Sequence, residues 1–153
     1  MRKSEFEQIV DKSFRSLENI YDFKRTETTY HRGGVFVRFK NPTTEVHLNY
    51  EIGVFPWLTI ADIKDPETEK ASLDWLLVEL GERETPRVDE AFLPAKMDEG
   101  QLETELKKKS DQLLKFGTDF LKGDFTLLPK LIKRADDYLA ECKKFADRHS
   151  SEK

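Results

Sequence analysis

Cysteine is almost absent from this sequence. Cys142 is the only one among 153 residues, so no intramolecular disulfide can form. Long apolar runs are missing too, since no stretch approaches the roughly 18 residues that a membrane-spanning helix needs. The first ten residues, MRKSEFEQIV, lack the apolar core of a signal peptide. Together these absences predict a cytoplasmic protein that does not bind a membrane.

Catalytic and cofactor motifs are also missing. The sequence has no glycine-rich loop of the kinds that bind phosphates or dinucleotides, and no G-x-S-x-G nucleophile elbow. Its histidines, His31, His47 and His149, form no local ligand pair, and no second cysteine could complete a metal site. Cys142 falls in the apolar stripe of an expected helix, where a buried, inert thiol is usual. We therefore expect a non-enzymatic protein without a metal or cofactor.

Charge is unevenly distributed along the chain. The net charge is −4, but residues 62–105 hold 5 basic and 14 acidic side chains, a net of −9. An acidic middle segment disfavours nucleic acid as a direct ligand, because phosphates are bound by Lys and Arg. It favours either a basic protein partner or a solvated face that keeps the protein soluble.

Two runs of alternating apolar and polar residues, 35–40 and 45–50, flank the turn sequence Asn41-Pro42-Thr43-Thr44. A hairpin around this turn places the apolar residues of both runs on one face. On the other face it places Arg38 opposite His47 and Lys40 opposite Glu45. Opposite charges across a ladder are stabilising, so both faces predict the same register.

Two further strands are expected, one within Phe23–His31 and one within Val54–Ile60, with a turn at Gly33-Gly34. Ile52-Gly53 fits either a tight turn or a bulge inside one long strand. Pro56 would place the last strand at an edge of the sheet, or mark where pairing stops. Whether a helix covers the aromatic residues of the second face stays open.

Apolar spacing of 3.6 residues predicts helices before and after the strands in the sequence. The first spans Ser4–Tyr21 with Ser4 and Glu7 as a capping box. A second begins at Asp65-Pro66 and ends before Gly81. Residues 82–97 follow as a long loop, with Phe92 and Leu93 expected to attach it to the core.

Two longer helices complete the chain. One begins at Asp98, with Gln101 as its capping partner, and extends to Leu121. The other follows the turn Gly123-Asp124 and carries the longest apolar stripe. Because the connection is short, we expect an antiparallel helical hairpin.

The predicted fold class is therefore α+β: an N-terminal helix, a three- to four-stranded antiparallel meander, then C-terminal helices including a helical hairpin. Residues 1–148 are expected to form a single domain, and residues 149–153 a polar tail.

Two segments resemble those of known proteins: VHLNYEIGV in the meander and LKGDFTLLPKL between the last helices. With the amphipathic N-terminal helix, they resemble small uncharacterised bacterial proteins, some of which sit among immunity proteins of toxin systems. The sharpest pieces are residues 50–54 and 121–125. No catalytic motif comes with the resemblance, so it implies no active-site residues.

These observations predict a protein-interaction module, immunity-like, that inhibits a partner by occupying its surface. Acidic side chains would face a basic cleft of the partner, and residues of the polar sheet face would add contacts. The candidate partner-binding residues are Glu82, Glu84, Asp89, Glu90, Arg38, His47 and Trp57.

Two alternatives belong to other classes. The protein could be an enzyme or a small-molecule binder, with a pocket between sheet and helices lined by Tyr50, Trp57 and Trp75. It could also be a dimerising module that uses the C-terminal helix pair, and the sequence leaves the oligomeric state open.

Overall fold

A five-stranded antiparallel sheet lies at the centre of the computed structural model, which describes residues 1–67, 70–89 and 97–151. The strands follow each other in space in chain order: β1 (Lys24–His31), β2 (Gly34–Lys40), β3 (Thr44–Glu51), β4 (Trp57–Asp62) and β5 (Lys70–Ser72). The helices are α1 (Lys3–Ser13), α2 (Arg15–Tyr21), α3 (Leu73–Glu79), the 3₁₀ helix η2 (Glu99–Gln101), α4 (Leu102–Phe116), α5 (Thr118–Leu121) and α6 (Leu128–Ser151). The α+β class and the antiparallel meander are confirmed, with one strand more than expected.

The predicted hairpin register is confirmed residue by residue. Arg38 pairs with His47 and Lys40 with Glu45 in the β2–β3 ladder. The alternation therefore gives the sheet two different faces. The first face is apolar and its side chains are almost completely buried: Val35, Val37, Phe39, Val46, Leu48, Tyr50, Leu58 and Ile60. The second face is mainly polar.

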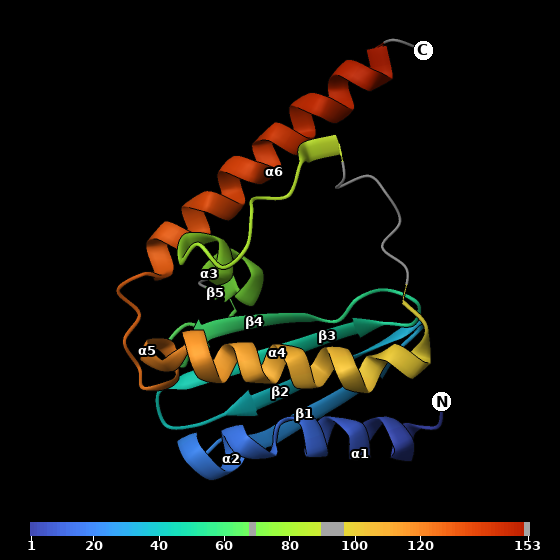
Figure 1. Cartoon of the computed structure of the whole chain (residues 1–153), viewed down its shortest axis with the longest axis vertical. Coiled ribbons are helices and arrows are strands. Elements are labelled where there is room, and N and C mark those ends of the chain that lie inside the picture. Colours follow the sequence, from blue (N-terminus) through green and yellow to red (C-terminus); the bar gives the residue numbers. More distant parts are fainter. Residues whose placement is uncertain (68–69, 90–96, 152–153) are drawn as a thin grey trace.

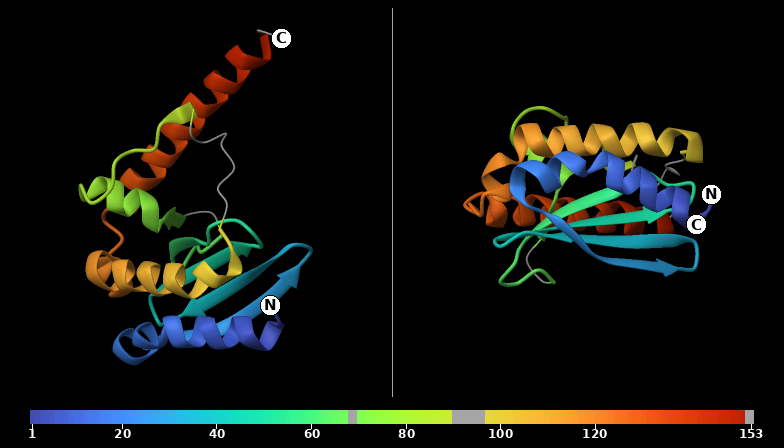
Figure 2. Two further views of the ribbon diagram at one scale, coloured as in Figure 1. Left: turned by 45° about the vertical axis from the view of Figure 1, so that its right-hand side comes forward. Right: turned by 90° about the horizontal axis from the view of Figure 1, so that it is seen from below.

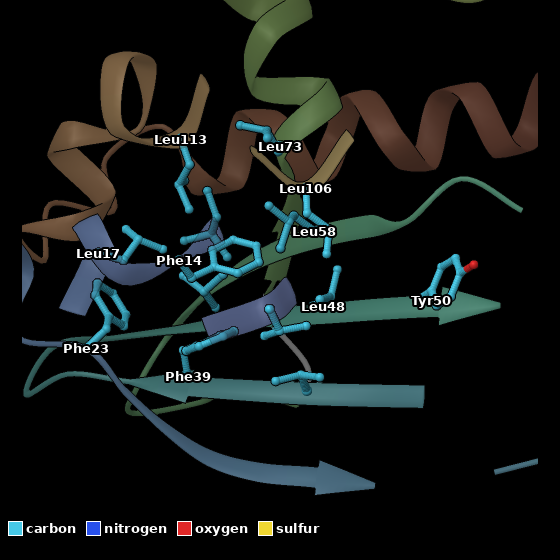
Figure 3. Packing of buried hydrophobic residues seen from close by; sticks show 14 of the residues in the cluster. Phe14, Leu17, Phe23, Phe39, Leu48, Tyr50, Leu58, Leu73, Leu106 and Leu113 are labelled. Carbon is cyan, nitrogen blue, oxygen red and sulfur yellow. The ribbon is translucent and has the colours of Figure 1, made fainter. Parts of the chain in front are cut away.

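Helices α1, α2 and α4 cover the apolar face as one layer (Figures 1 and 2). Phe14, between α1 and α2, is fully buried and its ring centroid lies 5.1 Å from that of Phe39 (Figure 3). Phe6 stacks on Tyr50 at 5.8 Å with the rings 9° from parallel. These contacts form the main core, since large buried side chains contribute most of the hydrophobic stabilisation.

The N-terminal helix differs from the prediction. It is interrupted at Phe14, and its N-cap is Arg2, which makes no side-chain capping bond. The expected capping box of Ser4 and Glu7 is thus wrong, and Glu7 instead accepts a hydrogen bond from Arg25 of β1 at 2.7 Å. An ion pair between Glu7 and Arg25 of the sheet thus forms in place of the predicted capping box.

The segment after β4 also differs. Asp65 and Pro66 lie in a turn, and the chain next forms β5, which the sequence did not predict. Helix α3 begins later, with Ser72 as N-cap accepting a hydrogen bond from the Trp75 amide at 3.2 Å. An Asp-Pro pair serves a turn as well as a helix start, so local chemistry could not separate the two. The helix does end before Gly81, which has a φ of 76°.

Strand β4 begins at Trp57, after a turn at Ile52-Gly53, rather than at Val54. Pro56 lies outside the ladder, and β4 is an internal strand paired with β3 and β5. The prediction of an edge strand was therefore wrong for β4, although pairing does stop at the proline.

The expected start at Asp98 is confirmed. Asp98 and Gln101 form a capping box through η2, with bonds of 3.1 and 3.2 Å. The single helix expected to reach Leu121 is divided at Gly117 into α4 and α5. In the 82–97 loop, Phe92 and Leu93 lie outside the described residues.

Helix α6 does not form the expected hairpin with α4. It packs against α3 and β5, and it diverges from α4 and projects from the body of the molecule (Figures 1 and 2). Its apolar stripe is buried only at the start, at Leu128 and Leu131, while Leu139 is 63% exposed and Cys142 is partly exposed. The expectation of a buried Cys142 is corrected accordingly, because no described element covers this end of the helix.

Asn41 joins three parts of this fold. Its side-chain amide donates to the backbone oxygens of Tyr21 at 3.0 Å and Leu121 at 3.2 Å. Its Oδ1 accepts from the amides of Thr43 and Thr44, at 3.0 and 2.8 Å. One buried side chain thus connects the end of α2, the β2–β3 turn and the end of α5.

We expect Asn41→Ala to destabilise the protein by about 2–4 kcal/mol, because it leaves several buried backbone groups without partners. Urea unfolding followed by circular dichroism measures this cost. Asn49→Ala is the matched control, since Asn49 is exposed on β3 and should tolerate the change. Equal unfolding midpoints for the two variants would contradict the assigned role of Asn41.

Candidate functional site

The second face of the sheet carries a buried ionic cluster. Glu45 and His47 are each 1% exposed, and His47 Nε2 lies 2.9 Å from Glu45 Oε1. Arg38 donates to Glu45 at 2.6 Å, and through its other nitrogens to Glu27 at 3.0 Å and Glu67 at 2.9 Å. Three strands and the turn after β4 are thereby connected through one guanidinium group.

These contacts shift the protonation equilibria. Burial lowers the pKa of His47, and Arg38 lowers it further, while the hydrogen bond to Glu45 raises it; the net shift is downward. Burial raises the pKa of Glu45, but the bonds from His47 and Arg38 outweigh it and hold that pKa below its ordinary value. At neutral pH His47 is therefore uncharged and donates through Nε2–H to the Glu45 carboxylate.

Two polar atoms of this face lack a partner. His47 Nδ1 and Thr59 Oγ1 are buried and make no hydrogen bond, and their residues are paired across the β3–β4 ladder. Because His47 Nδ1 is inaccessible, a molecule from solvent does not reach it in this structure. The candidate residues Arg38 and His47 thus lie together on either side of Glu45, with His47 buried and the Arg38 side chain 17% exposed.

The third candidate of this face, Trp57, is 57% exposed. It adjoins Val54 and Phe55, which are 38% and 43% exposed. All three line a hollow of about 600 Å³ that also involves Arg83 of the 80–89 segment and Lys109 of α4. We call Val54, Phe55, Trp57 and this hollow the Trp57 surface.

A second hollow lies on the other side of Trp57, between β4, β5, α3 and α6. It has a volume of about 390 Å³ and is lined by the aromatic rings of Trp57, Trp75 and Tyr138. The Trp75 and Tyr138 rings meet edge to face, with centroids 5.2 Å apart. We call this hollow the β4–α6 pocket.

The sequence predicted a pocket lined by Tyr50, Trp57 and Trp75, and the structure brings the two tryptophans together. Tyr50 instead lies on the apolar face, beside a small hollow of about 100 Å³ near Phe6. Sequence reasoning missed Tyr138, which approaches Trp75 only because α6 packs on α3. No local pattern signals a contact between segments more than 60 positions apart.

The acidic candidates lie on the segment that follows α3. Glu82 lines the Trp57 surface. Glu84 is exposed, and Asp89 bonds to Arg87 at 2.8 Å. Glu90 lies outside the described residues. Cations line the Trp57 surface as well, so its charge is mixed rather than uniformly acidic.

No family model, curated protein or solved structure matches this chain in the comparisons made. The resemblance to immunity proteins therefore stays a prediction. In the described part of the chain, no helix is both long enough and apolar enough to cross a bilayer. Across residues 1–67, 70–89 and 97–151, no three His, Cys, Asp or Glu side chains converge as a metal site would require.

The buried cluster predicts a pH dependence of stability. Below pH 6.5 the unfolded chain takes up a proton at His47 that the folded protein, with its lowered His47 pKa, resists. The free energy of unfolding should thus fall as the pH decreases from about 7.5 to 5.5, and His47→Gln should flatten this dependence. Urea titrations at several pH values measure it.

His31→Gln is the control, because His31 is exposed on β1. Its pH dependence should equal that of the unmodified protein. If His47→Gln retained the same slope, His47 would not be the group responsible.

Proposed function

We propose that this protein is a non-enzymatic interaction module that binds a partner protein through the Trp57 surface. The observation that supports this best is the exposure of three neighbouring apolar side chains, Val54, Phe55 and Trp57. Contiguous exposed apolar side chains on a soluble domain often mark a binding site, and tryptophan is enriched among the residues that dominate binding energy.

The surroundings of these side chains also suit a protein interface. The hollow beside them offers a recess for a partner side chain, and Arg83, which forms a 2.7 Å ion pair with Asp74, offers a polar boundary. Apolar centres with polar margins are typical of specific interfaces.

We further propose an immunity-like role, in which binding covers a basic site of the partner and inhibits it. This finer proposal rests on the acidic stretch 62–105 and on the sequence resemblance. Since the Trp57 surface has mixed charge, we assign the affinity to the aromatic contacts. The acidic side chains at 82–90 would mainly guide association.

The aromatic contacts can be tested by affinity capture from the source organism, followed by mass spectrometry. The unmodified protein should retain one dominant partner. The double variant Phe55→Ser, Trp57→Ser should raise the Kd for that partner by roughly 100-fold or more. Ile20→Ser is the matched control, because Ile20 is an apolar residue of α2 that is 65% exposed. Equal capture by all three proteins would contradict the proposal.

The proposed role of the acidic side chains in association can be tested separately on the purified complex. Neutralising the four acidic candidates should slow association and reduce its salt dependence, with a smaller effect on dissociation. Surface plasmon resonance at two salt concentrations measures both rates. The control neutralises four exposed acids of α6: Asp136, Asp137, Glu141 and Asp147. An association rate that falls equally in both variants would assign the effect to net charge alone.

A further inference from the structure

The β4–α6 pocket has the dimensions and walls of a small-molecule site. Its volume of about 390 Å³ lies within the range of about 300–1,000 Å³ that ligand pockets occupy. Three aromatic rings line it, two of them already in edge-to-face contact. Aromatic rings favour another aromatic ring placed edge to face or offset above them. The walls therefore select a flat, aromatic ligand.

The charges of the pocket are not balanced. Lys70, Arg83 and Asp74 are its charged residues. Arg83 and Asp74 neutralise each other in a 2.7 Å ion pair. Lys70 is exposed and forms no ion pair with a described carboxylate. The Lys70 charge acts on Glu67 without forming an ion pair with it, so a positive charge remains beside the aromatic rings and would attract an anion.

From the aromatic walls and the charge of Lys70 we propose that the β4–α6 pocket binds a small aromatic carboxylate. The ring would lie between Trp57, Trp75 and Tyr138, and the carboxylate would pair with the Lys70 ammonium. This proposal goes beyond partner binding and does not depend on it. Trp57 borders both sites, but Lys70 and Trp75 line the pocket and not the Trp57 surface.

The two tryptophans of the chain offer a direct assay, because both line this pocket. In a ¹H–¹⁵N correlation spectrum of the full-length protein they give two indole signals, which Trp57→Phe and Trp75→Phe assign. Titration with 2-naphthoate should shift both signals saturably. The neutral analogue 2-naphthamide should bind up to about fivefold more weakly, the usual contribution of a solvent-exposed ion pair.

Lys70→Met should abolish this preference for the acid over the amide and leave the weaker binding of the amide unchanged. Lys64→Met is the control, since Lys64 is an exposed lysine of the turn after β4 that does not line the pocket. Unshifted indole signals at millimolar 2-naphthoate would overturn the site. Equal affinity for acid and amide, or an unaltered preference in Lys70→Met, would overturn the ligand class. Partner capture by Phe55→Ser, Trp57→Ser remains a separate readout, so the two proposals can fail independently.

Discussion

The bonds of the Asn41 side chain fix the relation between sheet and helices. Asn41 begins the β2–β3 turn, where its Oδ1 accepts from the Thr44 amide, and its side-chain amide donates to carbonyls at the ends of α2 and α5. Thr44 adds a bond from its hydroxyl to the Phe120 carbonyl at 2.7 Å. A carbonyl at a helix end has no partner within its own helix, so a side chain that reaches two such ends holds both in place. The apolar layer of α1, α2 and α4 is thereby aligned with the first face of the sheet.

This alignment determines where binding surfaces can exist. With α1, α2 and α4 on the apolar face, the second face is covered only in part: by the Arg38 cluster over β2 and β3, and by α3 and α6 near β5. Between these two regions no element of the described chain covers Trp57, which is exposed. Both the Trp57 surface and the β4–α6 pocket therefore lie where the described residues leave the second face incompletely covered, and the β3–β4 loop adds Val54 and Phe55 to the first of them.

The sequence allowed prediction wherever a pattern repeats or a local partner is present. The β2–β3 register could be predicted because the apolar residues of one face and the opposite charges of the other face require the same pairing. The capping box could be predicted because Asp98 and Gln101 are three residues apart. Strand β5 has only three residues, too few to show a period, and Asp65-Pro66 is equally good chemistry for a turn and for a helix start. The proximity of Trp75 to Tyr138 depends on how α6 packs against α3. No stretch of sequence contains that information.

On the second face an ionisable side chain is buried and an apolar side chain is exposed, which stability alone does not explain. On neighbouring strands, the ionisable His47 is 1% exposed and the apolar Trp57 is 57% exposed. Burying a charged cluster costs desolvation energy that its ion pairs offset only with good geometry, and exposing an indole ring forgoes its hydrophobic contribution. A sequence optimised for stability alone would place these two side chains the other way round. The hydrogen bonds from Arg38 to Glu27, Glu45 and Glu67 offset much of the cost of burying Glu45. No described residue covers the exposed ring in the same way, and burying it under a bound molecule would add the hydrophobic contribution that it lacks in the free protein.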